Sequence, residues 1–320
     1  MQAKLSSKGT LGSRFSRSLK KYGGTYLALL PFFLLFVCFI LIPMIEGMAM
    51  SFTDWSTSSK GEINFVGLEN YVSLFSGKGS ASKRYLTSLT NLLIYVPITV
   101  SVGLFIALAL ALIVGQFRDK AYNFFRGSYF FPTVLPLFLC AGIWQWYMAS
   151  ETGLIASNLA KIGIGVNTIW KDTPGYAIAL VILIDIWNSV GLNFVIFSTG
   201  IQDIPRDLYE AAEIDGAGTF TKMIRITIPL LEPILFFVIT YSFISALQVY
   251  DIPWILTNTT DINAVGGANQ VMLFPVMEMV RNVYKGGKSA LGRAAAEGVI
   301  LMAIIMVITL IQYKVRRKKV

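Results

Sequence analysis

The chain has 320 residues, of which 55% are hydrophobic and only 14% are charged, and its formal net charge is +9. Soluble domains carry about 25% charged residues, so this composition excludes an ordinary soluble protein and predicts one that spans a membrane. The chain has no histidine and only two cysteines, Cys38 and Cys140, each inside an apolar run. We therefore expect buried free thiols rather than a disulfide or a metal site.

Six apolar segments are long enough to cross the roughly 30 Å hydrocarbon core of a bilayer. They occupy residues 26–45, 88–114, 127–149, 176–197, 228–249 and 290–313. The sequence thus predicts an all-α, polytopic membrane protein. It has a basic tail at 1–22, one transmembrane domain over 23–320, and a polar loop at 198–227. Pro31 and Pro43 predict a kink or a break in the first span.

Lys and Arg residues indicate the orientation of these spans. They are concentrated in the tail at 1–22, in the loops at 115–126 and 198–227, and after the last span. Loops that flank spans on the cytoplasmic side carry an excess of Lys and Arg. The pattern predicts that both termini and the 198–227 loop are cytoplasmic. It also accounts for the net positive charge without a nucleic-acid partner.

The loop between the fourth and fifth spans is the longest stretch rich in charge, and it is mostly acidic over 203–229. Pro205 suits the start of a helix, residues 206–214 are good helix formers, and Gly216 suits its end. A helix of two turns between spans cannot bury itself. Helices that lie on lipid are usually basic on their polar face, so we expect this acidic helix to dock onto another protein.

The same loop carries a motif. Glu-Ala-Ala at 210–212, Gly216, and Ile-Thr-Ile-Pro at 226–229 resemble the EAA signature of ABC importer permeases, Glu-Ala-Ala-x3-Gly-x9-Ile-x-Leu-Pro, with isoleucine where leucine is usual. The resemblance implies the ABC importer permease fold, in which this loop is a coupling helix seated in a cleft of a cytoplasmic ATPase. The positions that it assigns to ATPase coupling are Leu208, Tyr209, Glu210, Ala211, Ala212, Asp215, Gly216, Ile226 and Pro229.

A second element, Gly-Leu-Glu-Asn-Tyr at 67–71, resembles one that follows the first span in sugar-type ABC permeases. The resemblance implies the permease subunit of an ATP-driven, binding-protein-dependent importer of an oligosaccharide or other carbohydrate, in the cytoplasmic (inner) membrane. It implies a second homologous permease, two ABC ATPase subunits and an extracellular or periplasmic solute-binding protein as partners, besides membrane lipid. ATP and Mg belong to the ATPases, and this chain is expected to bind no cofactor.

Polar residues inside the spans are candidates for the substrate path. Asp185 lies in the middle of the fourth span, where a charge is costly and usually faces a cavity or a partner. A structural hydrogen bond to a neighbouring helix remains an alternative, and we interpret Glu232 and Glu297 as structural. Carboxylate, amide and aromatic groups together suit a sugar. The candidate path consists of Asp185, Trp187, Asn188, Asn193, Tyr241, Gln248, Tyr250 and Asp251.

The sequence was also compared with what an enzyme and a secondary carrier would require. Residues 285–289, Lys-Gly-Gly-Lys-Ser, resemble the end of a phosphate-binding loop, but Asn282 stands where that motif needs its first glycine. Without this loop and without a catalytic set, we do not expect an enzyme. An ion-gradient-driven secondary carrier of polar solutes remains the alternative function. It would need neither an ATPase nor the EAA loop, and Asp185 is its only support.

Overall fold

The computed structural model describes residues 11–56, 63–115, 119–149, 153–162, 173–257, 261–287 and 289–317. Within these ranges the secondary structure is helical, with one isolated antiparallel bridge between Thr53 and Phe65. The all-α prediction is confirmed. The chain divides into two compact units, Met1–Met50 and Ser51–Val320, each of which is described by itself. The first ten residues of the predicted basic tail lie outside the described residues.

The first unit is a single interrupted helix. It consists of α1 (Leu11–Phe36), five residues of π-helix (η1, Val37–Leu41) and α2 (Ile42–Met50). The helix continues through Pro31 and does not break there. The π turn ends at Leu41, two residues before Pro43, whose ring would otherwise clash with the carbonyl one turn earlier. Cys38 is exposed, contrary to our expectation, because the described residues of this unit form one helix alone.

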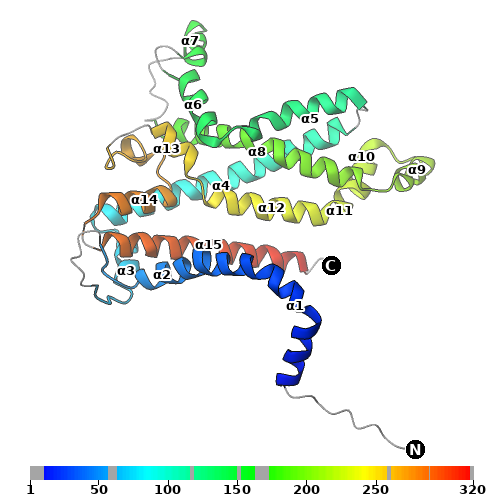
Figure 1. Cartoon of the computed structure of the whole chain (residues 1–320). Coiled ribbons are helices and arrows are strands. Elements are labelled where there is room, and N and C mark those ends of the chain that lie inside the picture. The colour runs from blue at the N-terminus through cyan, green and yellow to red at the C-terminus, as the bar shows by residue number, and fades with distance from the viewer. Residues whose placement is uncertain are drawn as a thin grey trace, which may run out of the picture. The chain divides into compact units, whose positions relative to one another are not determined.

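The second unit contains the remaining helices, labelled in Figure 1. They are α3 (Glu69–Phe75), α4 (Gly79–Val114), α5 (Asp119–Val134), α6 (Leu137–Tyr147), α7 (Leu154–Lys161), α8 (Tyr176–Gln202), α9 (Arg206–Ile214), α10 (Thr219–Lys222), η3 (Met223–Thr227), α11 (Ile228–Leu230), α12 (Glu232–Leu247), α13 (Asp251–Thr257), η4 (Ala268–Gln270), α14 (Pro275–Lys285) and α15 (Ala290–Arg317).

The long helices of this unit pack side by side. α4 packs against α8 and α12, α5 packs against α8, and α12 also contacts α15. Gly191 is required where α8 meets α5, because a Cβ atom there would collide with the carbonyl oxygen of Tyr129. In Figure 1, α9 lies at the same end of the long helices as the C-terminal end of α15, whereas α13 and α14 lie at the opposite end.

The segment predicted as one span at 127–149 differs from the prediction. The helix begins earlier, at Asp119, and it is bent by 93° between α5 and α6. The bend falls at Leu135, the residue before Pro136, and a residue before proline is disfavoured in helical geometry. Within the described residues, five helices are long and apolar enough to cross a membrane, and the bent pair would make a sixth.

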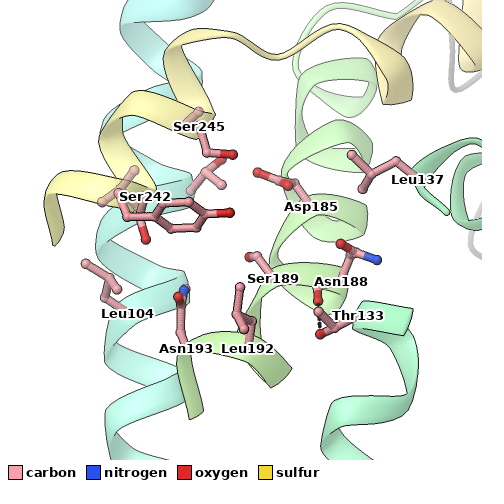
Figure 2. A pocket seen from close by; sticks show the side chains of 15 residues that line it. Leu104, Thr133, Leu137, Asp185, Asn188, Ser189, Leu192, Asn193, Ser242 and Ser245 are labelled. Atoms are coloured by element: carbon pink, nitrogen blue, oxygen red, sulfur yellow. Dashed lines mark hydrogen bonds between the residues drawn. The ribbon is translucent and has the colours of Figure 1, made fainter. Parts of the chain in front are cut away.

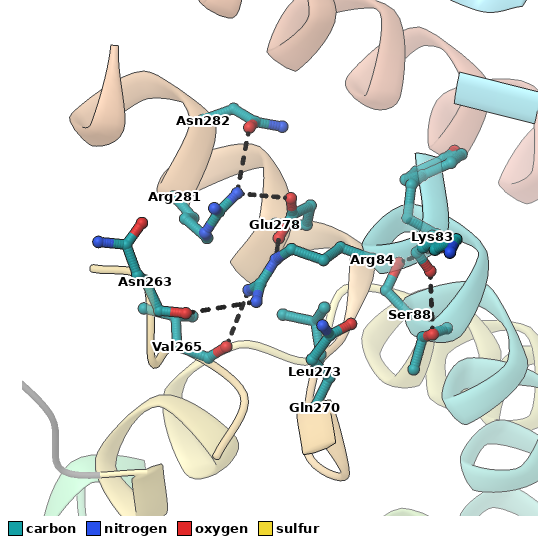
Figure 3. Close-up of polar contacts among 12 residues, drawn as sticks. Lys83, Arg84, Ser88, Asn263, Val265, Gln270, Leu273, Glu278, Arg281 and Asn282 are labelled. Atoms are coloured by element: carbon teal, nitrogen blue, oxygen red, sulfur yellow. Dashed lines mark hydrogen bonds and ion pairs between the residues drawn. The ribbon is translucent and has the colours of Figure 1, made fainter. Parts of the chain in front are cut away.

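A buried ionic cluster holds the part of α4, from Gly79 on, that precedes the span predicted at 88–114. Glu278 on α14 accepts hydrogen bonds from Arg84 Nε at 2.9 Å and from Arg281 Nη1 at 2.8 Å (Figure 3). Arg84 also donates to the carbonyl oxygen of Val265 at 2.8 Å, so it ties the segment before α14 to α4. Charged groups this deeply buried must be paired, and the cluster lets the polar start of α4 remain helical.

The two acidic residues that we interpreted as structural each contact a neighbouring helix. Glu297 on α15 is buried, and its Oε1 accepts a hydrogen bond from Asn282 of α14 at 2.8 Å. Glu232, the first residue of α12, pairs with Arg316 near the end of α15 at 3.1 Å. The Arg316 guanidinium also lies 4.6 Å from the ring centroid of Phe236. These contacts fasten α15 to the rest of the unit at both of its ends.

Candidate functional site: a coupling helix and a polar cavity

Helix α9 occupies the residues predicted for the coupling helix. Pro205 precedes it, and the helix ends in a Schellman motif. Gly216 has φ +76, a left-handed conformation that favours glycine. Its N–H donates to the Glu213 carbonyl at 3.0 Å, and the N–H of Ala217 donates to the Ala212 carbonyl at 2.8 Å. The glycine of the EAA signature therefore fixes where the helix stops.

One face of α9 packs on its own chain, which we did not foresee. The hydroxyls of Tyr209 and Thr227 are 2.9 Å apart, and Thr227 is buried. Beside them is a cavity of about 250 Å³. It is lined by Leu112, Gly115, Ile201, Tyr209, Thr219, Lys222, Met223 and Thr227, which places the inner face of α9 against the ends of α4 and α8.

The opposite face of α9 is open. The side chain of Ile214 is 88% exposed and that of Leu208 is 43% exposed. Ile214 was not among the predicted coupling positions. Of those besides Leu208, five are also exposed and three are half-buried. The exposed ones are Glu210, Ala211, Asp215, Gly216 and Pro229, and the half-buried ones are Tyr209, Ala212 and Ile226. Among the described residues Glu210 makes no ion pair, whereas Glu213 lies 3.6 Å from Lys222. An apolar and acidic surface is thus available to a partner.

The second candidate site is a cavity of about 270 Å³ between α4, α8, α12 and the bend of α5 and α6 (Figure 2). Nine of the fifteen lining residues carry hydroxyl, amide or carboxylate groups, and the other six are apolar. The lining residues are Thr99, Val100, Gly103, Leu104, Thr133, Leu137, Asp185, Asn188, Ser189, Leu192, Asn193, Tyr241, Ser242, Ser245 and Ala246.

Asp185 reaches this cavity from the middle of α8. Its Oδ2 accepts a hydrogen bond from the Tyr95 hydroxyl of α4 at 2.6 Å. Ser189 and Asn193 follow at four-residue intervals, so they share one face of the helix with Asp185. This polar stripe faces the cavity, while the hydrogen bond to Tyr95 holds the carboxylate in place. The structural and the substrate-path interpretations of Asp185 are therefore compatible.

Asn188 lines the cavity, but its side-chain amide is hydrogen-bonded to the bend between α5 and α6. Its Nδ2 donates to the carbonyl oxygen of Pro132 at 2.7 Å. The Thr133 hydroxyl in turn donates to the backbone oxygen of Asn188 at 2.6 Å. The Pro132 carbonyl, which also accepts a hydrogen bond from the Leu135 N–H at 3.2 Å, thus receives a second donor from α8. We consequently assign Asn188 to holding the bend, in addition to its place on the cavity wall.

Four residues of the predicted path lie outside this cavity. Trp187 packs edge-on against Trp144 with ring centroids 5.9 Å apart, and Tyr250 packs against Trp254 at 5.2 Å. Gln248 and Asp251 stand at the junction of α12 and α13 and do not line the cavity. Four of the predicted residues do line it, namely Asp185, Asn188, Asn193 and Tyr241.

Sequence reasoning missed several polar residues of the cavity, among them Thr99, Ser189, Ser242 and Ser245. The helical spacing from Asp185 would have indicated Ser189, because residues four apart share a helix face. No local signal indicated Thr99 or Tyr95, because their positions depend on how α4 packs against α8.

Comparison with known proteins decides the family. The model of the binding-protein-dependent transport system inner membrane component family matches residues 70–320. The chain belongs to this family. One relative is the arabinooligosaccharides transport system permease protein AraP of Bacillus subtilis. It is 31% identical to this permease, over 92% of this chain and 88% of the relative. It is 30% identical to the sulfoquinovosyl glycerol permease protein SmoG of Agrobacterium fabrum, over 92% of this chain and 90% of the relative.

A third relative, the sn-glycerol-3-phosphate permease protein UgpA of Yersinia pestis, is also 30% identical, over 92% of this permease and 94% of the relative. Among solved structures, a chain of a bacterial alginate ABC transporter, in complex with a periplasmic protein that holds an alginate pentasaccharide, matches with a TM-score of 0.80. It is 21% identical and covers 95% of this permease and 98% of the matched chain. The ABC permease fold inferred from the EAA loop is thereby confirmed.

Proposed function

We propose that this permease is the membrane-spanning subunit of an ATP-driven, binding-protein-dependent carbohydrate importer. The observation that carries the proposal is the pairing of an exposed EAA helix with a polar cavity between α4, α8 and α12. Hydroxyl, amide and carboxylate groups line the cavity, and these groups bind polyhydroxylated solutes. The names of the relatives support the same class, because they include transport of arabinooligosaccharides and of sulfoquinovosyl glycerol.

The proposed assembly contains a second homologous permease, two cytoplasmic ATPases that hold ATP and Mg, and an external solute-binding protein. Both termini and α9 face the cytoplasm, and the permease domain spans 23–320 after the basic tail at 1–22. α9 and the basic end of α15 lie at the same end of the unit (Figure 1), which agrees with this orientation. When ATP closes the ATPase pair, movement of α9 would be passed to α12 and open the cavity outward.

The proposed roles of single residues follow from their positions. Leu208, Glu210 and Ala211 form the surface that enters the ATPase cleft. Asp185 and Asn193 offer polar groups to the solute within the cavity. The family assignment favours this importer over the ion-gradient carrier, since a carrier would use neither an ATPase nor an exposed EAA helix.

Orientation is tested with single cysteines and a membrane-impermeant thiol reagent on intact cells, in a background that lacks Cys38 and Cys140. Exposed Asn269, in the segment between α13 and α14, should be labelled from outside as cysteine. Gly218, after α9, should be labelled only when the cells are opened. Labelling of position 218 in intact cells would contradict the topology, and with it the proposed function.

The assembly is tested by affinity purification of the tagged permease from its native membrane. The expected result is that an ABC ATPase and a second permease elute with it, and that ATP hydrolysis rises when the solute-binding protein and its carbohydrate are added. A permease that elutes alone and still transports its solute in response to an ion gradient would support the carrier instead.

A further inference from the structure

The cavity between α4, α8 and α12 has an unusual balance of charge. Fifteen residues line it, and Asp185 is the only one that carries a formal charge. No Lys or Arg is among them. All other polar groups are hydroxyls of Ser, Thr and Tyr or amides of Asn. This wall can both donate and accept hydrogen bonds, but it offers no cation to an anionic solute.

No Lys or Arg among the residues that the structure describes forms an ion pair with Asp185. Among the described residues the ion pairs join Glu278 to Arg84 and Arg281, Glu213 to Lys222, and Glu232 to Arg316. None of them includes Asp185. Within the described part of the chain, its carboxylate accepts one hydrogen bond, at Oδ2, from the neutral hydroxyl of Tyr95. A carboxylate accepts up to four hydrogen bonds, so most of its capacity is left for a solute.

The opposite wall complements this carboxylate. Figure 2 shows Ser245 of α12 directed across the cavity toward Asp185 of α8, with Ser189 and Asn193 farther along the same helix. A neutral sugar can donate a hydroxyl to Asp185, a charge-assisted hydrogen bond of the stronger kind. Its other hydroxyls can exchange hydrogen bonds with the serines and the asparagine. A carboxylate, sulfonate or phosphate on the sugar would instead face a like charge.

We propose that Asp185 makes this cavity selective for neutral polyhydroxylated solutes over anionic ones. The inference rests on the proposed function, and it narrows the substrate class of that same site. Like charges a few ångströms apart in a partly desolvated site disfavour binding by about tenfold or more. The relatives do not decide the point, because their named solutes include both neutral arabinooligosaccharides and anionic glycerol 3-phosphate.

The charge of the cavity can be measured without knowing the solute. Cys38 and Cys140 are replaced, Ser245→Cys is introduced, and the purified complex is treated with cationic, neutral and anionic methanethiosulfonates of similar size. Each rate is divided by the rate with a free small thiol. Because all three reagents attack the same thiolate, the ratio of the normalised rates reports the local potential. Ser242→Cys on the same wall serves as a second reporter if Ser245→Cys does not assemble.

We expect the cationic reagent to react about tenfold faster than the anionic one after normalisation, in line with the Coulomb argument. Asp185→Asn, which keeps the shape and removes the charge, should bring the ratio close to one. Asp185→Glu should preserve it. Equal normalised rates in the unmodified cavity, or a ratio that Asp185→Asn leaves unchanged, would overturn the proposal.

An uptake experiment separates this inference from the proposed function. Cells that express the whole importer receive a mixture of neutral arabino- and malto-oligosaccharides with alginate oligosaccharides and glycerol 3-phosphate, and cytosolic solutes are identified by mass spectrometry. We expect energy-dependent accumulation of neutral sugars alone. Accumulation of an anionic sugar would overturn the charge selectivity but retain the carbohydrate importer. Uptake of a non-carbohydrate solute alone would contradict the proposed function. The normalised methanethiosulfonate rates would still test the charge of the cavity, because they do not depend on the solute.

Discussion

The hydroxyl of Tyr209, in α9, lies 2.9 Å from the hydroxyl of Thr227, where the π-helical turn η3 leads into α11 and α12. This contact joins the exposed EAA helix to the start of a long helix that lines the cavity. The π turn itself ends just before Pro229, which cannot donate to the preceding turn. Movement of α9 can therefore be transmitted toward α12 through this contact.

Tyr209→Phe removes this hydroxyl contact and keeps the ring. We expect a loss of about 1 kcal/mol in the anchoring of α9, since a typical hydrogen bond contributes this much. Uptake should fall, while basal ATP hydrolysis of the complex is retained. The control is Tyr313→Phe, because Tyr313 is exposed near the end of α15. Equal uptake in both variants would show that the contact does not contribute to coupling.

Gly216→Val tests the Schellman ending of α9. A β-branched residue at φ +76 is strained by roughly 1–3 kcal/mol, so the end of α9 should shift and uptake should be lost. Gly218→Val is the matched control. Gly218 has φ −67 and open space around its Cβ position, and valine fits there without strain. Uptake measured in cells with equal amounts of assembled complex compares the two, and equal loss in both would contradict the geometric explanation.

Asp185 and Asn188 should behave differently, because only Asn188 holds the bend between α5 and α6. Asn188→Ala removes the shorter of two hydrogen bonds to the carbonyl of Pro132 and leaves that from the Leu135 N–H at 3.2 Å, at a cost of about 1 kcal/mol, and should lower both assembly and transport. Asp185→Asn should lower transport more than assembly. Size-exclusion profiles and uptake per assembled complex distinguish the two effects. Wild-type transport in well-assembled Asp185→Asn would restrict Asp185 to a structural role.

The buried cluster around Glu278 predicts a large effect on stability. Glu278→Ala leaves Arg84 and Arg281 as unpaired buried cations, which costs about 3–5 kcal/mol. The temperature of thermal unfolding in detergent should fall markedly. Glu213→Ala is the control, since the Glu213 side chain is 74% exposed and its pair with Lys222 contributes about 1 kcal/mol or less. Similar unfolding temperatures for the two variants would contradict the assigned importance of the cluster.

Local signals in the sequence were enough to predict the all-α fold and the start and end of α9. Apolar length marks spans, and Pro205 with Gly216 marks the start and the end of α9. The bend at Leu135 was missed, because proline within an apolar run signals a local disturbance but not its angle. The contact of Tyr95 with Asp185 and the cluster of Arg84 with Glu278 join residues far apart in the sequence. They depend on packing between helices, which no local pattern encodes.

The same difference, between local signals and packing between helices, explains which residues of the candidate site could be predicted. Asp185 was identified because an acidic residue in an apolar span is anomalous by itself. Ser242 and Ser245 are ordinary in any helix, and only the position of α12 beside α8 gives them a role. Trp187 was included for its chemistry, but the packing of α6 against α8 places it on Trp144 instead.

The central claim, that α9 couples this permease to an ATPase, is tested most directly by ATP hydrolysis of the purified complex in lipid, with and without binding protein and substrate. Glu210→Ala should weaken docking by about 3–5 kcal/mol if the carboxylate pairs with a buried cation of the ATPase, and by about 1 kcal/mol or less in an exposed pair. We expect Glu210→Ala and Gly216→Val to leave the membrane helices folded and to abolish the stimulation of ATP hydrolysis and uptake. Full stimulation and full uptake in both variants would contradict the claim.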